Sequence, residues 1–197
     1  MIIRVLTMVG LLFVASSAFA ADANSRFALR GVGLTSCEQF LKAMQERKEN
    51  VLVAGGWIEG YVTAVNKFTP DTFDMAPWQS TQALLGLVSR NCERNPQAGF
   101  FQIVDSMMNF LMPARLTAQS ERVLVESGST KFYVYQKTMK DIQEKLISIG
   151  YLKGAADGQF GPQTKAALEA YQKAQQIEVT GLPDQNTLFK LLTSQGG

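Results

Sequence analysis

The side chains that carry out chemistry in enzymes are few in this chain. Among its 197 residues there is no histidine, and there are two cysteines, Cys37 and Cys92. This excludes Ser-His-Asp and Cys-His catalysts and any zinc site with four His or Cys ligands. No Ser-x-x-Lys sequence occurs, so the serine acyl-enzyme route has no support.

One carboxylate lies where acid catalysis has to be considered. Glu59 falls within an apolar helical stretch, and a glycosidase would need a second carboxylate at a defined distance from it. Asp71, Asp74 and Asp105 are the plausible partners, and no spacing selects one of them. The simpler interpretation is a solvated carboxylate at the border of a helix, so we do not expect an enzyme.

The composition bounds the class of protein. Hydrophobic residues make up 46% of the chain and charged residues 18%, with a formal net charge of +2. This is too apolar for a disordered chain and too neutral for a protein that binds nucleic acid through bulk electrostatics. We therefore expect a globular protein of one or two domains, with no nucleic-acid partner, no cofactor and no metal site.

The first twenty residues have the pattern of a signal peptide. Arg4 precedes an apolar run at 5–15, and Ala18-Phe19-Ala20 is a cleavage site of small residues. A retained membrane anchor is the alternative, but the run is shorter than the ~20 residues that span a bilayer. We expect cleavage after residue 20. The mature protein at 21–197 is expected to be exported to the periplasm and to have no membrane span.

Export changes how the two cysteines are interpreted. An even pair in an oxidising compartment predicts a disulfide between Cys37 and Cys92. In the chain-entropy model, closing so long a loop stabilises the fold by about 4 kcal/mol. Two free thiols, or one reactive thiol, are the alternatives. A reactive thiol needs a base or a cation beside it, and no histidine can serve.

The elements that would position these residues are mostly helical. Apolar residues recur with a spacing near 3.6 over 35–112, the core of a helical domain predicted at 21–118. Thr35 or Ser36 is suited to cap the first helix. Later helices are expected at 51–68, 79–92 and 100–112. Within the second of them, Gly56-x-x-x-Gly60 predicts a close contact between helices.

Beyond these helices the pattern changes twice. Alternating apolar residues on either side of Ser127-Gly128-Ser129-Thr130 predict a β-hairpin, which we interpret as a junction at 119–137. Three short amphipathic helices then follow at 138–193, before a flexible tail at 194–197. The spacing Gly158-x5-Thr164 is repeated as Gly181-x5-Thr187, which indicates that two loops enter their helices in the same way.

Aromatic residues of the helical domain are expected to be core, with one exception. The set is Trp57, Tyr61, Phe68, Phe73 and Trp78. Trp78 follows Pro77 in a loop, where an exposed ring would be a candidate contact for a protein partner.

The C-terminal helices carry a specific family resemblance. The matching residues are Ile142-Gln143-x-x-Leu146-x-x-x-Gly150-Tyr151-x-x-Gly154-x-x-Asp157-Gly158-x-Phe160-Gly161-Pro162-x-Thr164-x-x-Ala167-Leu168-x-x-Tyr171-Gln172, then Thr180-Gly181-x-x-Asp184-x-x-Thr187-Leu188-x-x-Leu191. This pattern closely resembles the peptidoglycan-binding domain type 1 family over 138–193. Leu188 departs from it, because many members carry tryptophan there.

The resemblance implies a three-helix domain that binds peptidoglycan. Most of the motif residues are expected to determine the fold, since glycines relax the loop and the Asp157 carboxylate accepts N–H groups. Aromatic faces and loop amides beside the second helix suit sugars or stem peptides. The candidate ligand-binding residues are Tyr151, Asp157, Gln159, Phe160, Thr164 and Tyr171.

A fainter resemblance covers the helical domain at 34–112. Cys37-x-x-Phe40-Leu41, Gly56-x-x-x-Gly60-Tyr61-Val62 and a helix ending at Cys92 resemble the acid-stress chaperone HdeA and type VI secretion amidase-immunity proteins. Members of those groups often carry further cysteines, which are absent here. The resemblance implies a domain that binds a protein partner and carries over no catalytic residue.

The sequence thus predicts a mainly α protein with a disulfide-linked helical bundle, a short β-hairpin and a three-helix peptidoglycan-binding domain. We expect a non-catalytic periplasmic protein that anchors to peptidoglycan and binds an unidentified periplasmic protein. The alternatives are a cell-wall hydrolase with a targeting module, and a chaperone-like protein whose wall-binding module has lost its ligand.

Overall fold

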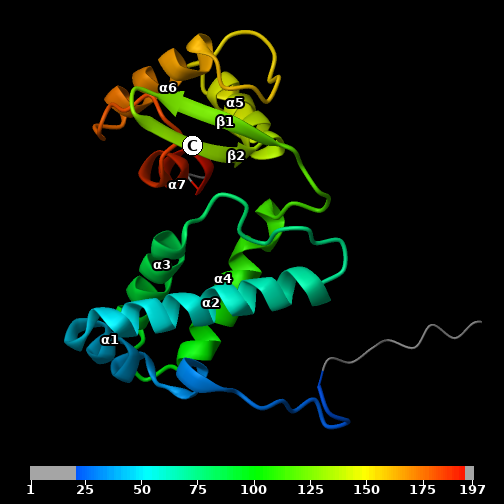
Figure 1. Ribbon diagram of the computed structural model, residues 1–197, viewed down its shortest axis with the longest axis vertical. Coiled ribbons are helices and arrows are strands. Elements are labelled where there is room, and N and C mark those ends of the chain that lie inside the picture. The colour runs from blue at the N-terminus through cyan, green and yellow to red at the C-terminus, as the bar shows by residue number, and fades with distance from the viewer. Residues whose placement is uncertain (1–20, 194–197) are drawn as a thin grey trace, which may run out of the picture.

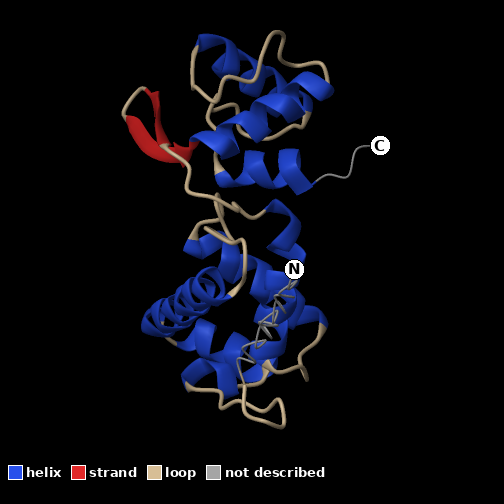
Figure 2. Ribbon diagram, turned by 90° about the vertical axis from the view of Figure 1, so that its right-hand side faces the viewer, coloured by secondary structure: helices blue, strands red, loops and turns tan. Residues whose placement is uncertain are grey.

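The computed structural model describes residues 21–193 and is mainly α-helical, as predicted. The signal peptide expected at 1–20 and the tail expected at 194–197 lie outside the described residues. The helices form two groups stacked along the long axis of the molecule (Figure 1), and the hairpin lies beside the upper group (Figure 2). Each group has its own hydrophobic cluster, and we call the groups the N-terminal and C-terminal units.

The N-terminal unit contains the four expected helices. They are α1 (Cys37–Glu46), α2 (Lys48–Phe68), α3 (Thr81–Arg94) and α4 (Phe100–Leu111), with short 3-10 turns at η1 (Gly31–Leu34) and η2 (Met112–Ala114). Ser36 caps α1, because its side chain accepts from the Gln39 N–H while the Gln39 side chain accepts from the Ser36 N–H. This reciprocal pair satisfies two N–H groups that the first turn would leave free.

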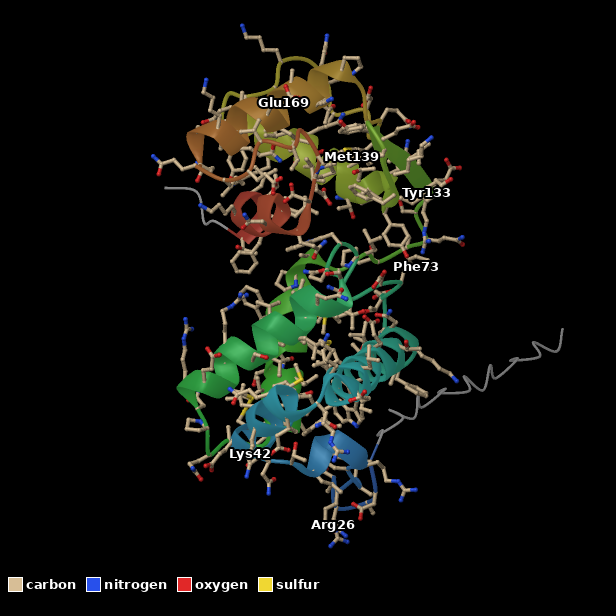
Figure 3. The ribbon with its side chains drawn as sticks, turned by 60° about the vertical axis from the view of Figure 1, so that its left-hand side comes forward. Arg26, Lys42, Phe73, Tyr133, Met139 and Glu169 are labelled. Atoms are coloured by element: carbon tan, nitrogen blue, oxygen red, sulfur yellow. A yellow bond between two sulfur atoms is a disulfide. The ribbon has the colours of Figure 1, made fainter. Side chains whose placement is uncertain are left out.

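The predicted disulfide between Cys37 and Cys92 is confirmed. It joins the start of α1 to α3, and both cysteines have 0% exposure (Figure 3). The bond spans 55 residues and lies in the same cluster as Phe40 and Phe100, whose ring centroids are 4.7 Å apart. The cross-link therefore fastens the two helices at the centre of their shared core.

The aromatic residues expected in this core divide into buried and exposed positions. Trp57 and Tyr61 pack against the cluster and stack at 5.7 Å. The Trp57 indole N–H donates to the Arg30 carbonyl at 2.8 Å, which fastens the segment before η1 to α2. Phe68, at the last position of α2, is 69% exposed and Phe73 is 37% exposed, so the assignment of these two residues to the core was wrong.

The expected role of Gly56 and Gly60 was also wrong. Both are exposed on α2, and a Cβ added at either would have no atom within 4 Å. The close contact between helices occurs one residue earlier: a Cβ at Gly55 would lie 2.9 Å from Thr81 Cγ2 of α3. The glycine spacing did not locate the contact, because it does not show which face of α2 packs against α3.

Gly56→Ala is expected to stabilise the N-terminal unit, whereas Gly55→Ala is not. In an exposed helix interior, alanine is more favourable than glycine by about 0.5–1 kcal/mol. At Gly55 the new methyl group would press on α3 and offset that gain. Thermal unfolding followed by circular dichroism measures both. Equal gains for the two variants would contradict the contact between Gly55 and α3.

The C-terminal unit combines the hairpin with three helices. Strands β1 (Arg122–Ser127) and β2 (Thr130–Tyr135) pair antiparallel, with Val125 opposite Phe132. The helices are α5 (Gln136–Ser148), α6 (Pro162–Ala174) and α7 (Gln185–Thr193), and proline opens α6 as expected. Val123, Val125 and Val134 lie in one cluster with α5, so the hairpin belongs to this core rather than standing between two cores.

Several contacts fasten the units to each other, among them the edge-on packing of Phe73 against Tyr135 at 6.0 Å. Gln185, the first residue of α7, accepts from the Ser80 N–H at 3.0 Å and donates to the Trp78 carbonyl at 2.5 Å. Arg90 of α3 lies over the Phe189 ring at 5.4 Å from its centroid. The half-buried Trp78 ring packs against the C-terminal cluster. Trp78 thus contacts the other unit of its own chain.

Candidate functional site

The loop between α5 and α6 is organised around one buried glutamine. Gln143 is 2% exposed, and the two hydrogens of its Nε2 are shared among three acceptors: Asp157 Oδ1 at 2.8 Å, the Gln159 carbonyl at 3.0 Å and Thr164 Oγ1 at 3.1 Å. Its Oε1 accepts from the Gly158 N–H at 2.7 Å. We call this arrangement the first glutamine cradle. It holds the loop in one conformation, because every polar atom of the buried amide is used.

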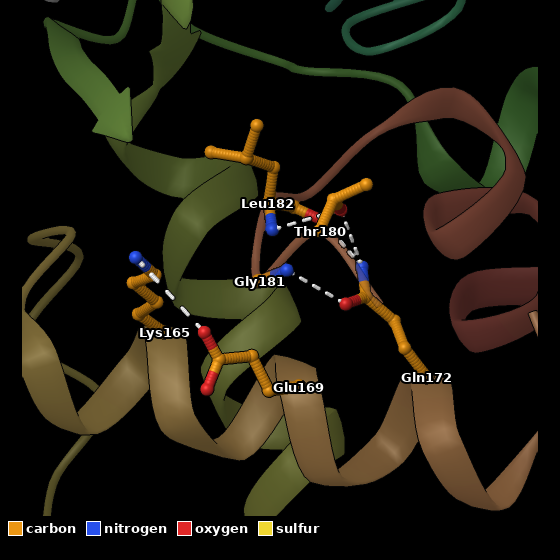
Figure 4. Close-up of polar contacts among 6 residues, drawn as sticks. All are labelled: Lys165, Glu169, Gln172, Thr180, Gly181 and Leu182. Carbon is orange, nitrogen blue, oxygen red and sulfur yellow. Dashed lines mark hydrogen bonds and ion pairs between the residues drawn. The ribbon is translucent and has the colours of Figure 1, made fainter. Parts of the chain in front are cut away.

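A second glutamine cradle holds the loop between α6 and α7 in the same way. Gln172, with 0% exposure, donates through Nε2 to Thr180 Oγ1, the Leu182 carbonyl and Thr187 Oγ1, all within 2.8–2.9 Å. Its Oε1 accepts from the Gly181 N–H at 2.8 Å (Figure 4). The repeat seen in the sequence is therefore a structural repeat of helix, buried glutamine and loop.

The glycines of the two cradles contact the preceding helix at equivalent positions. Gly158 has φ +76° and Gly181 has φ +65°, a backbone region that glycine adopts without strain. A Cβ at either would lie under 3.0 Å from side chains of residues three and seven positions before the cradle glutamine. Those side chains are Gln136 and Lys140 in α5, and Lys165 and Glu169 in α6. Glycine is thus required in both loops for conformation and for space.

The structure separates the predicted site residues by burial. Thr164 and Tyr171 are only 4% and 3% exposed: the first accepts from Gln143, and the ring of the second packs edge-on against Tyr151 at 5.5 Å. Burial, and to a smaller degree Tyr151, raise the pKa of Tyr171 above its usual value. Asp157 and Gln159 are exposed, while Tyr151 and Phe160 are half-buried against the C-terminal cluster.

A shallow hollow beside Tyr151 is the concave surface nearest to these residues. Its volume is about 300 Å³, and it is lined by Tyr151, Leu152, Lys153, Gln163, Ala166 and Ala167. Lys153 and Gln163 bring a cation and an amide to an aromatic ring, and Ala166 leaves room above the helix. Sequence reasoning missed these three residues, although the spacing of 163 and 166 places two of them on one face of α6.

The Asp157 carboxylate is held in its ionised form by the first glutamine cradle. The N–H of Gln159 donates to Oδ1 at 2.8 Å, and the Gln143 amide donates to the same atom. These donors lower the pKa of Asp157 below its ordinary value of 3.8. The predicted role of this carboxylate as an acceptor of loop N–H groups is thereby confirmed.

Acid is expected to weaken the C-terminal unit through this residue. Because the folded pKa is depressed, ionised Asp157 stabilises the fold above pH 3.8, and that contribution is lost as pH falls further through the folded pKa. Asp157→Asn should remove this part of the pH dependence and lower stability at pH 7. Urea unfolding of both proteins between pH 2 and pH 7 measures it, and identical pH dependence would contradict the assignment.

The N-terminal carboxylates considered for catalysis have structural partners. Glu59 is exposed, and its Oε1 accepts from the Thr81 hydroxyl at 2.7 Å, across the contact between α2 and α3. Asp105 accepts from the Tyr61 hydroxyl at 2.6 Å; burial and this contact raise the pKa of Tyr61. Within residues 21–193 no group of three His, Cys, Asp or Glu could hold a metal ion.

Comparison with known proteins assigns both units. A model of the HdeA/HdeB family matches residues 3–102, just over half of the chain. The chain belongs to the HdeA/HdeB family. A second family model, that of a peptidoglycan binding domain, matches residues 136–191 of this HdeA/HdeB family member. The match includes both glutamine cradles. No curated protein and no solved structure matches the chain.

The two matches agree with the resemblances seen in the sequence. They support peptidoglycan binding by this HdeA/HdeB family member and a place in the cell envelope. Both families are of binding or chaperone type rather than catalytic. Across the described part of the chain, no helix is both long and apolar enough to cross a membrane.

Proposed function

We propose that the protein is exported to the periplasm, binds peptidoglycan through its C-terminal unit, and binds a protein partner through its N-terminal unit without catalysing a reaction. The observation that carries this proposal is the pair of glutamine cradles within the region matched by the peptidoglycan binding domain. The first glutamine cradle fixes the loop that borders the hollow beside Tyr151. Such a preformed surface binds with modest affinity, which a repetitive wall raises through avidity.

The wall-contacting residues are proposed from exposure. Tyr151, Asp157, Gln159 and Phe160 keep accessible surface at or near the loop, and Lys153 and Gln163 add a cation and an amide. Thr164 and Tyr171, proposed from the sequence alone, act on the ligand indirectly, by holding the loop and the Tyr151 ring.

Sedimentation of the 21–197 protein with purified sacculi tests which unit binds. Gly158→Val should unfold the C-terminal unit, because the added side chain would collide with α5 in a left-handed backbone. We expect this variant to lose binding while its disulfide-linked unit stays folded. The matched variant Cys37→Ser/Cys92→Ser should keep binding. The opposite pattern would assign wall binding to the N-terminal unit.

The proposal of a protein partner depends on exposed apolar side chains. In the N-terminal unit, six large hydrophobic residues are more than half exposed: Phe27, Leu34, Leu52, Val53, Phe68 and Phe110. In the C-terminal unit only Tyr133 and Val179, of the described residues, exceed that level. Contiguous exposed apolar surface marks sites of protein interaction, and of these residues Leu52 and Val53 are neighbours on α2. It suits a chaperone-like role, in which the C-terminal unit would hold the N-terminal unit at the wall.

A hydrolase is the alternative of a different class, and one assay separates it from a binding protein. Purified 21–197 protein is incubated with sacculi, and soluble muropeptides are measured. We expect no release above the level of a heat-denatured control. Release at catalytic protein concentrations would overturn the non-catalytic proposal.

A further inference from the structure

The largest hollow described in this structure lies between the two units. Its volume is about 760 Å³, and segments far apart in the sequence line it: the loop before α3, the end of α4, the connection 113–120, the start of α5 and the end of α7. This volume is in the range of ligand sites, which occur preferentially where domains meet. We call it the interdomain groove.

The two walls of the interdomain groove differ in chemistry. The N-terminal unit contributes apolar surface from Pro77, Trp78, Phe110 and Pro113. The connection and the C-terminal unit contribute hydroxyl and charged groups, at Ser120, Thr138, Thr193 and the ion pair of Lys137 with Asp141. A ligand that fits must therefore present small apolar groups on one side and hydrogen-bonding groups on the other.

Arg115 lines the interdomain groove, and its guanidinium is held by residues that lie outside this lining. Its Nε donates to the Asp71 carbonyl and the Thr72 hydroxyl, each at 3.2 Å, and its Nη1 donates to the Met112 carbonyl at 2.9 Å. These bonds fix the guanidinium plane but use neutral acceptors. Among the described ion pairs none involves Arg115, and Nη2 has no hydrogen bond to residues 21–193.

The walls are also held in place before any ligand arrives. A short antiparallel bridge pairs Asp74 with Leu116, so the connection that carries Arg115 is fastened to the loop before α3. The two hydrogen bonds of Gln185 fix the backbone at Trp78 and Ser80 against α7. A preorganised cation of this kind favours a carboxylate, because the guanidinium pays little ordering entropy when it binds.

We propose that the interdomain groove binds a short peptide that ends in a free carboxylate and carries small alkyl side chains, namely the D-alanine end of a peptidoglycan stem peptide. This rests on the proposed function, since the wall is the source of the ligand. The terminal carboxylate pairs with Arg115, the methyl groups lie on the wall of Trp78 and Phe110, and the peptide amides face the hydroxyl groups. Peptidoglycan would then contact both units, not the C-terminal unit alone.

Isothermal titration of the 21–197 protein with three probes tests the proposal. They are diacetyl-L-Lys-D-Ala-D-Ala, its C-terminal amide, and diacetyl-L-Lys-L-Ala-L-Ala. We expect the amide to bind at least tenfold more weakly than the D,D acid, because it removes the charge that Arg115 recognises. The L,L acid should also bind more weakly. Equal or tighter binding of the L,L acid would overturn the wall as the source and favour the carboxyl end of a protein.

Arg115→Gln is the decisive variant. It should weaken binding of the D,D acid about tenfold and abolish the difference between acid and amide, which a merely structural role of Arg115 would leave intact. Lys42→Gln, which removes an exposed positive charge at the far end of the N-terminal unit (Figure 3), should change nothing. An unchanged acid-to-amide ratio in Arg115→Gln would refute the proposal.

Two further variants keep the test decisive if Arg115→Gln folds poorly. Phe110→Ser changes a ring that is 62% exposed, so it should fold, and it should weaken acid and amide about equally. Lys153→Gln tests the hollow beside Tyr151 instead: a larger loss of probe binding there than in Phe110→Ser would place the peptide beside Tyr151 and overturn the interdomain groove. If these variants still sediment with sacculi, the proposed function stands whatever the peptide titrations show. If the unmutated protein does not sediment with sacculi, the proposed function itself is contradicted.

Discussion

Gln143→Met is expected to unfold the C-terminal unit at temperatures where the N-terminal unit remains folded. Methionine has nearly the shape of glutamine, so the core keeps its volume while all hydrogen bonds of the first glutamine cradle are lost. The Gly158 N–H would stay buried without an acceptor. Each such orphaned group costs about 1–3 kcal/mol, so a loss of several kcal/mol is expected, a large fraction of the stability of a small unit.

The structural repeat supplies controls for this experiment. Gln172→Met should have an effect of similar size, because the second glutamine cradle has the same bonds. Gln159→Met lies in the first loop but changes an exposed side chain, and it should be nearly neutral. Differential scanning calorimetry resolves the two units. A Gln143→Met protein as stable as Gln159→Met would show that the cradle does not hold the unit together.

The sequence anticipated the loops of these cradles better than their centre. The spacing from Gly158 to Thr164 and from Gly181 to Thr187 is local, so the repeat is visible in the chain. The glutamines are 15 and 9 residues before their glycines, because the first loop is longer and Gln143 lies further from the end of its helix than Gln172 does. Only the packing of the helices brings each glutamine amide to its loop. The sequence motif therefore contains Gln143 and Gln172 but does not indicate their role.

Tertiary contacts decide the exposure of two candidate residues, and the sequence does not show these contacts. Tyr171, a candidate ligand-binding residue, is 3% exposed, and its ring packs edge-on against Tyr151. Trp78 was a candidate partner contact if its ring was exposed; the ring is half-buried against the C-terminal cluster, and the Trp78 carbonyl accepts from Gln185, which is 107 residues away in the chain. No local pattern indicates a contact of that separation. Helix ends and the hairpin, which depend on neighbouring residues, were in contrast predicted closely.

Removing the disulfide is expected to destabilise the N-terminal unit far more than the C-terminal unit. Cys37→Ser/Cys92→Ser opens a loop of 55 residues and places two hydroxyl groups in a core where both cysteines have 0% exposure. The loop closure alone accounts for about 4 kcal/mol in the chain-entropy model. For a unit of this size, that corresponds to a fall in Tm of roughly 15 °C or more.

Reduction of the unmutated protein separates the cross-link from the serine side chains. Calorimetry in the presence of dithiothreitol should lower the Tm of the N-terminal unit by most of the amount seen in the double variant, while the C-terminal transition moves little, because both cysteines lie in the N-terminal cluster. Mass spectrometry of oxidised protein should find two hydrogens fewer than in the reduced form. Equal shifts of both transitions would instead mean that the two units unfold as one cooperative fold. The contacts that would couple them are those of Gln185 with the loop before α3 and of Phe189 with α3.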